Sequence, residues 1–165
     1  MKNSEKGSVA SGDDWIPPES DASMAADPPV PLLHEGVTKE IIGAFYTVNK
    51  ELGPGFVESV YSRAMAIELR ERGLHVDVER ELTVYFRGRV VGTFRADHFV
   101  EHLVAVEYKV ARAIDPAHQA QLLNCMKASD VEVGFVFNFG ARAEFRRFVL
   151  DNDTKRSRSI RANPT

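Results

Sequence analysis

The sequence predicts an α/β fold in which helices flank a mixed central β-sheet. Apolar residues recur at helical spacing in residues 36–52 and 56–72, and runs rich in β-branched and aromatic residues follow in residues 82–111. One further helix separates these runs from two strand-like segments in residues 131–150. Strands that alternate with helices in this way are typical of layered α/β domains.

The composition fits a single domain without a membrane partner. The 165 residues are 44% hydrophobic and 27% charged, and no stretch reaches the roughly 20 apolar residues of a membrane span. The N-terminal lysines are not followed by an apolar segment, and the single cysteine cannot form an internal disulfide, so we expect a protein of the reducing cytoplasm. A net charge of -3 excludes a strongly basic protein, so any contact with nucleic acid needs a local basic patch.

Three segments divide the chain. Residues 1–33 are rich in Ser, Asp, Ala and Pro without periodicity, which predicts a disordered leader. Trp15 is the one residue of this leader that could dock on a partner, and a passive tail is the simpler interpretation. Residues 34–151 form the predicted domain. Residues 152–165 resemble a short basic tail whose side chains either contact phosphates or form a solvated charge run, namely Lys155, Arg156, Arg158 and Arg161.

The two N-terminal helices are predicted from their apolar stripes and from the breaks between them. The first stripe comprises Val37, Ile41, Phe45 and Val48, and LGPG at residues 52–55 ends that helix. The second helix offers Val60, Ala64 and Ile67 to one stripe. Gly73 stands where a C-terminal cap belongs, so we expect this helix to end there.

The remaining elements are marked by their turns. A hairpin turning at Arg87 and Gly88 joins the first two strands, and a tight turn near Glu101 and His102 leads into the strand at residues 103–111. Asp115 followed by Pro116 predicts the start of a helix, with the aspartate as N-cap and the proline in the first helical position.

The strand LVAVEYKVA, residues 103–111, carries an unusual pair of charges. Alternate residues of a strand face the same way, so Glu107 and Lys109 share one face with two small alanines, while the other face is apolar. An ion pair on a solvated face and a catalytic pair both fit this pattern.

Asp97 adds a third group to this pair. It is expected to end the preceding strand, and an antiparallel return brings it beside Glu107 and Lys109. Two adjacent carboxylates repel each other unless a cation lies between them, and oxygen ligands suit Mg²⁺ or Mn²⁺. An ammonium nearby can orient an attacking water or offset charge on a phosphate, so the three residues suggest metal-dependent phosphodiester hydrolysis.

These residues resemble the signature of the PD-(D/E)xK nuclease superfamily, with Ala96 in place of the usual proline before Asp97. The segment GFVESVY, residues 55–61, matches the G-x-x-E-x-x-Y motif of the GxxExxY protein family, a RecB-like branch of that superfamily. HQAQLLNCMK and GFVFNFG are similar to the family's helix and strand motifs. The resemblance spans roughly residues 34–151 and implies a restriction-endonuclease-like core.

The resemblance also implies roles for individual residues. Asp97 and Glu107 would bind Mg²⁺ or Mn²⁺ together with the main-chain carbonyl of Tyr108, and Lys109 would be the catalytic lysine. Glu58 would supply a further metal contact. Gln121 would lie near the attacking water or the substrate phosphate. Cys125 departs from the family, which usually has tyrosine at that position.

Other interpretations are open for several of these side chains. Glu58 lies in the first helical turn, where the helix dipole favours a carboxylate whatever the function. His118 shares a helix face with Gln121 and Cys125, yet a hydrogen-bonded structural histidine is the simpler expectation. A phosphate-facing patch and a scattered solvated surface fit four basic residues equally well, namely Lys127, Arg142, Arg146 and Arg147.

The leading hypothesis is a metal-dependent nuclease, a hydrolase that binds DNA or RNA. The alternative is a nuclease-fold module with weak or no catalysis that binds nucleic acid or a protein partner, because a shared fold does not guarantee a shared reaction. Two further alternatives are that the protein is a subunit that acts only with a protein partner, or that it forms a homodimer.

Overall fold

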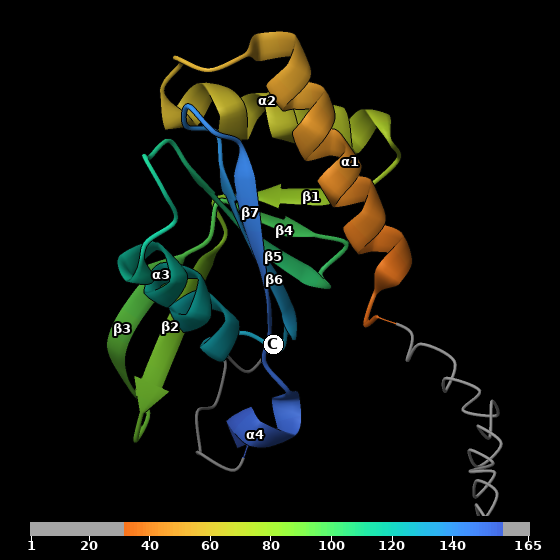
Figure 1. The fold of residues 1–165 in the computed structure, drawn as a ribbon. Helices are drawn as coiled ribbons and strands as arrows, with labels where there is room; N and C mark the ends of the chain where they lie inside the picture. The colour runs from red at the N-terminus through yellow and green to blue at the C-terminus, as the bar shows by residue number, and fades with distance from the viewer. Residues whose placement is uncertain (1–31, 157–165) are drawn as a thin grey trace, which may run out of the picture. The chain divides into compact units, whose positions relative to one another are not determined.

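The computed structural model describes residues 32–156, apart from the side chains of Thr154 and Arg156. The predicted leader with Trp15, except for its last two residues, lies outside the described residues, as do Arg158 and Arg161. The elements, shown in Figure 1, are α1 (Glu35–Leu52), α2 (Glu58–Glu71), β1 (Val76–Val78), β2 (Glu81–Phe86), β3 (Arg89–Arg95), β4 (His98–Val100), β5 (Val104–Lys109), α3 (Pro116–Lys127), β6 (Val133–Asn138), β7 (Glu144–Val149) and α4 (Asn152–Arg156).

The strands form a five-stranded mixed sheet in the order β1-β4-β5-β6-β7 and a separate two-stranded sheet of β2 and β3. Only β5 and β6 pair in parallel, across α3, and the other neighbours are antiparallel. The predicted α/β class with a mixed sheet is therefore confirmed. The hairpin of β2 and β3 was wrongly assigned to the main sheet, because the short strands β1 and β4, which take that place, are too brief to show a period in the sequence.

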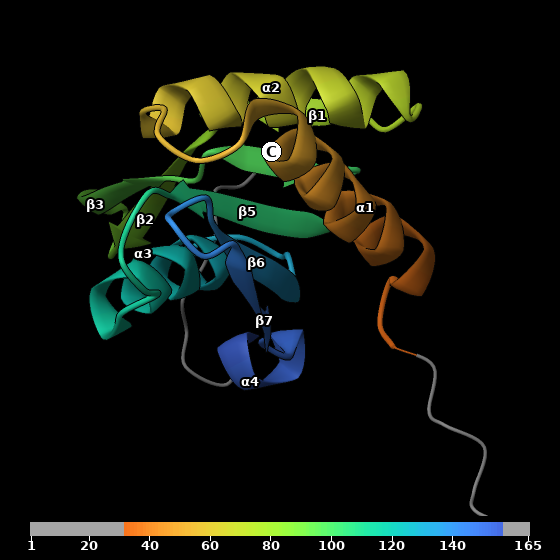
Figure 2. The same ribbon diagram turned by 45° about the horizontal axis from the view of Figure 1, so that its top comes forward.

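Two hydrophobic cores lie on opposite faces of the main sheet. Helices α1 and α2 cover one face and α3 covers the other, as Figure 2 shows. The first core joins both N-terminal helices to alternate residues of β5 and β6 and includes Ile41, Phe45, Met65, Val106, Tyr108 and Phe137. The second core lies under α3 and includes Phe99, Ala105, Leu122, Cys125, Met126 and Val136. The sheet is thus buried on both faces at β5 and β6.

The apolar stripe of α1 is confirmed, but the stripe predicted for α2 is only partly correct, because Ala64 packs against the first core and Ile67 does not. The buried residues of α2 are Tyr61, Met65, Ala66 and Leu69, whereas the side chain of Ile67 is exposed. Tyr61 sets this rotation of the helix, because its ring stacks on Phe139 at 4.4 Å and its hydroxyl donates to the carbonyl of Gly53 at 2.6 Å. None of the helices in the described part of the chain is long and apolar enough to cross a membrane.

Both predicted turns are two-residue turns in the left-handed region. Arg87 and Gly88 have φ values of 50° and 76° between β2 and β3. Glu101 and His102 have φ values of 53° and 55° between β4 and β5, and the amide of Leu103 closes this second turn on the carbonyl of Val100. Such turns match the right-handed twist of paired strands.

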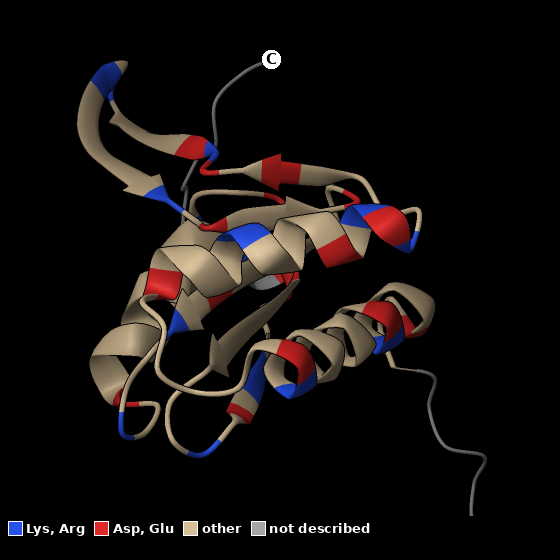
Figure 3. Cartoon of the chain, turned by 90° about the horizontal axis from the view of Figure 1, so that it is seen from above, with Lys and Arg blue, Asp and Glu red and all other residues tan. Residues whose placement is uncertain are grey.

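The segment predicted to be a solvated basic tail begins with helix α4. Lys155 is buried, and its Nζ donates to the carbonyls of Ser129 at 3.1 Å and Val131 at 2.6 Å. The expectation of a solvated charge is therefore wrong for Lys155. Elsewhere, acidic and basic residues are interspersed over the elements, with basic residues at the tip of the β2–β3 hairpin (Figure 3).

Candidate active site

Strand β5 separates a polar pair from the apolar core behind it. Glu107 lies on the α3 side of the sheet, whereas Val106 and Tyr108 belong to the core under α1 and α2. Glu107 has no exposed surface, and the side chain of Lys109 is 11% exposed. The predicted division of the strand into two faces is confirmed, and the alternative of a solvated face is wrong for Glu107.

Asp97 reaches this pair through the β4–β5 hairpin. His98 pairs with Val106, so the residue before it stands beside Glu107, and the Oδ2 of Asp97 accepts the amide hydrogen of Tyr108 at 2.7 Å. Asp97 does not end the preceding strand as predicted, because β3 ends at Arg95 and Asp97 falls just before β4. The antiparallel return is nevertheless present, and it brings the two carboxylates together.

The Glu107 carboxylate is held at one oxygen and unpaired at the other. Its Oε2 accepts a hydrogen bond from the amide nitrogen of Gln121 at 2.9 Å and lies 3.5 Å from the ammonium of Lys109. Its Oε1 is buried and has no hydrogen-bond partner within the described residues. Burial, and then the charge of Asp97, raise the pKa of Glu107 to about 8, while Lys109 opposes the shift.

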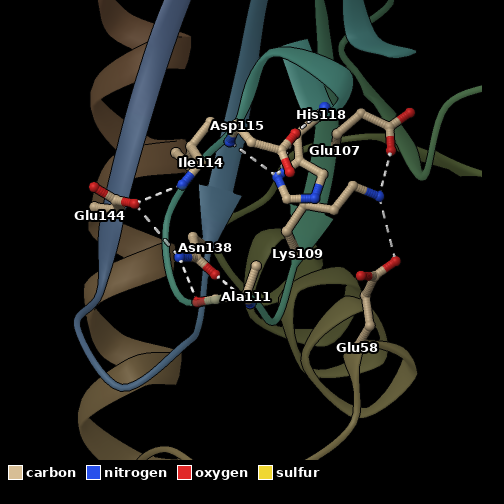
Figure 4. Close-up of polar contacts among 9 residues, drawn as sticks. All are labelled: Glu58, Glu107, Lys109, Ala111, Ile114, Asp115, His118, Asn138 and Glu144. Carbon is tan, nitrogen blue, oxygen red and sulfur yellow. Dashed lines mark hydrogen bonds and ion pairs between the residues drawn. The ribbon is translucent and has the colours of Figure 1, made fainter. Parts of the chain in front are cut away.

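The Lys109 ammonium lies between two carboxylates. Figure 4 shows its Nζ reaching Glu107 on one side and Glu58 on the other, each at 3.5 Å. Glu58 is the first residue of α2, where the amide groups of the first helical turn favour its charge. The dipole interpretation of Glu58 and its place beside Lys109 are therefore compatible.

Gln121, His118 and Cys125 all come from α3, with different surroundings. Asp115 caps the helix, and the Nδ1 of His118 accepts the amide hydrogen of Asp115 at 3.3 Å, which confirms the structural interpretation of this histidine. Cys125 is buried near the carboxylates, and burial raises the pKa of its thiol to about 12. Of the three side chains, only Gln121 hydrogen-bonds to Glu107.

Asn138 holds the loop that follows β5. Its Oδ1 accepts from the amide of Ala111 at 2.9 Å, and its Nδ2 donates to the carbonyl of the same residue at 2.9 Å (Figure 4). Gly140 is required beside it, since a Cβ there would lie 2.0 Å from the carbonyl oxygen of Ala111. The NFG motif was the sequence signal, but nothing in it indicated the partner segment.

His98 supports β5 from the opposite face and was not predicted. It is fully buried, and its Nδ1 lies 2.8 Å from the hydroxyl of Tyr108 while its Nε2 lies 3.4 Å from that of Ser62. Burial lowers the pKa of His98 to about 4, so the ring is neutral at pH 7. The histidine therefore fixes the Tyr108 side chain directly behind the polar cluster.

The four basic residues considered as a phosphate-facing patch have different surroundings. Arg147 donates from its guanidinium to the carbonyl of Leu33 at 3.1 Å, so it ties the start of the domain to β7. Lys127, Arg142 and Arg146 are exposed.

The cluster has the chemistry of a site for a hard divalent cation. Mg²⁺ and Mn²⁺ prefer oxygen ligands, and the cluster offers two neighbouring carboxylates, one with a buried oxygen that no described group satisfies. A carboxylate buried without a full set of partners is costly, and a cation beside it would remove much of that cost. The residues present therefore fit such an ion.

Comparison with known proteins identifies one family. The family model described as the PD-(D/E)XK nuclease superfamily matches residues 35–148. The solved structure of SSO0001 is similar, with 21% sequence identity and a TM-score of 0.47, over 73% of this chain and 63% of that one. The chain thus spans less than two thirds of that protein's length. None of the curated proteins compared with the chain matches it.

Proposed function

Because the chain belongs to the PD-(D/E)XK nuclease superfamily, we propose that it is a nuclease that hydrolyses phosphodiester bonds of DNA or RNA with the help of Mg²⁺ or Mn²⁺. The observation that carries the proposal is the buried, unpaired Oε1 of Glu107 beside a second carboxylate and a lysine. A purely structural cluster would be expected to satisfy that oxygen.

Asp97 and Glu107 would hold the ion, with the main-chain carbonyl of Tyr108 as a third ligand. The bound ion would act as a Lewis acid that offsets negative charge on the phosphate. The Tyr108 amide holds Asp97 Oδ2, and the Gln121 amide holds Glu107 Oε2, so both carboxylates are oriented before substrate binds. Orientation in advance is what makes such groups effective in the transition state.

Lys109 would act on the substrate side of the cluster. Its ammonium, fixed between Glu107 and Glu58, can position an attacking water by a hydrogen bond and offset the charge that develops on the phosphate. The half-exposed Glu58 would restrain the lysine and supply a further contact to the ion. Gln121 would act mainly through Glu107, by leaving Oε1 free for the ion.

We further propose that the chain belongs to the GxxExxY branch, and the place of each motif residue in the fold supports this proposal. Gly55 has a φ of 116°, which favours glycine. Glu58 faces Lys109, and Tyr61 fixes the segment before α2 through Gly53. The motif thus builds the wall of the cluster opposite Gln121.

The proposal is tested by incubating the purified chain with single- and double-stranded DNA and RNA in Mg²⁺, Mn²⁺ or EDTA. We expect at least one substrate to be cleaved with metal and none with EDTA, and we expect the isosteric Glu107→Gln variant to lose the cleavage while it keeps its fold. Binding without cleavage by the wild type would favour the alternative of a nuclease-fold binding module.

A further inference from the structure

A second cluster of metal-ligand side chains lies at the other end of the β4–β5 hairpin. His75, Asp77 and His102 each offer one ligand atom, and these atoms lie within 4.8 Å of one another. We propose that the three residues bind a transition-metal ion of the Zn²⁺ type. This proposal does not depend on the proposed nuclease activity.

The backbone brings the three side chains together from two neighbouring strands. His75 immediately precedes β1, Asp77 lies within β1, and His102 follows β4, with which β1 pairs. The amide of Glu101 donates to the carbonyl of His75 at 3.0 Å, and the Glu101 carboxylate accepts the amide hydrogen of His75. These two bonds lock His75 to the turn that carries His102.

Within the cluster, each carboxylate oxygen of Asp77 faces a different imidazole. Oδ1 lies 2.9 Å from the Nε2 of His75, and Oδ2 lies 3.2 Å from the Nδ1 of His102. The two rings are tilted by 40° with their centres 4.8 Å apart. The nearest guanidinium nitrogen, on Arg80, is 3.9 Å from Asp77, so that arginine is a weak competitor for the carboxylate.

The donor set selects the class of metal. Imidazole nitrogen suits Zn²⁺ and similar ions, whereas Mg²⁺ prefers oxygen alone, so this cluster and the one at Glu107 would take different ions. Three protein ligands leave a coordination position open. Because the side chains of His75 and His102 are 56% and 62% exposed, that position would face solvent.

The two clusters are separate sites. Strand β5 places about 10 Å between Val104, beside the turn, and Glu107. An ion at the histidine cluster would link the start of β1 to the β4–β5 turn and so would brace the hairpin that carries Asp97.

The test is a Zn²⁺ titration by calorimetry of the untagged, chelator-treated protein, repeated with Co²⁺ and its visible absorption. The variants are His75→Asn and His102→Asn, and the matched control is His34→Asn. His34 and His102 both have left-handed backbones, with φ values of 57° and 55°, which asparagine tolerates, so the two substitutions differ mainly in whether they touch the cluster.

We expect the wild type and His34→Asn to bind one Zn²⁺ per chain, and the affinity of His75→Asn and His102→Asn to fall by about tenfold or more. No saturable binding by the wild type would overturn the proposal, because a merely hydrogen-bonded cluster predicts that result. Zn²⁺ binding that survives in both cluster variants but is lost in Glu107→Gln would also overturn it.

Discussion

Glu107 is a buried carboxylate at the centre of the candidate site. Its neighbours on β5 are fully buried, yet its carboxylate lies among them beside a second acidic side chain. The fold holds it with Gln121 and Lys109 at one oxygen only. The other oxygen is available for the ion that the proposed function requires.

The raised pKa of Glu107 predicts an effect of pH on stability. The folded pKa, about 8, exceeds the ordinary value of 4.5, so the folded chain binds the extra proton and the free energy of unfolding falls as pH rises between these values. Each pKa unit corresponds to about 1.4 kcal/mol. In EDTA, the free energy of unfolding of the wild type should fall by up to about 4 kcal/mol between pH 5 and pH 8. The free energy of unfolding of Glu107→Gln should not show this fall.

Denaturant unfolding at the two pH values measures this difference. Adding Mg²⁺ at pH 8 should restore stability to the wild type and not to Glu107→Gln. Equal pH dependence of the two proteins would show that Glu107 is ionised without cost in the fold.

The signature residues could be predicted from the sequence at this scale, because strand alternation alone puts Glu107 and Lys109 on one face. His98 could not, since its importance depends on Tyr108 and Ser62, which meet it only in three dimensions. The role of Asn138 could not be predicted either, because its bonds to Ala111 join segments far apart in the chain.

At the scale of elements, the end of β6 fixes the loop that leaves β5. The amide side chain of Asn138 bonds both backbone groups of Ala111, and the backbone of Gly140 packs against the same residue. This contact aligns the ends of the two parallel strands beside the candidate site.

Gly140→Ala should therefore destabilise the domain by about 2 kcal/mol or more, because the new Cβ would strike a carbonyl oxygen that cannot move as a side chain does. Gly36→Ala is the matched control, since nothing lies within 4 Å of the added Cβ and the residue is helical. Chemical denaturation should show no loss of stability for the control. A similar effect of both substitutions would contradict the tight approach at Gly140.

The buried ammonium of Lys155 in α4 is expected to stabilise the fold. Lys155→Met keeps the length of the side chain and removes its donors, which leaves the carbonyls of Ser129 and Val131 without their partner. The cost should be about 1 to 3 kcal/mol. Lys39→Met, at an exposed position, serves as the control. Equal midpoints for the two variants in urea unfolding would show that the two hydrogen bonds of Lys155 add nothing to stability.

The elements themselves were predicted with uneven success. The long helices and strands have clear periods, and their capping residues, such as Gly73, are where they were expected. Strands β1 and β4 have no such signal, because three residues cannot show a period. The face of α2 was only partly predicted, because the buried stripe runs through Tyr61, Met65 and Leu69 and leaves Ile67 exposed.

For the molecule as a whole, the order of elements was enough to predict the class but not the pairing of the strands. The family match over residues 35–148 gives the superfamily and not the substrate. With a net charge of -3, the chain has no general attraction for nucleic acid. For the proposed nuclease, the binding of nucleic acid would therefore depend on local groups around the site.

In the proposed nuclease, Lys109 and the two carboxylates form a hydrolytic centre. The most direct test is the single-turnover cleavage rate of the preferred substrate in saturating Mg²⁺ or Mn²⁺, for the wild type, Lys109→Ala and the exposed control Lys39→Ala, with folding checked by circular dichroism. Lys109→Ala should be slower by a factor on the order of 10² to 10³, and Lys39→Ala should be near wild type. Equal rates for a folded Lys109→Ala protein and the wild type would show that Lys109 takes no part in hydrolysis.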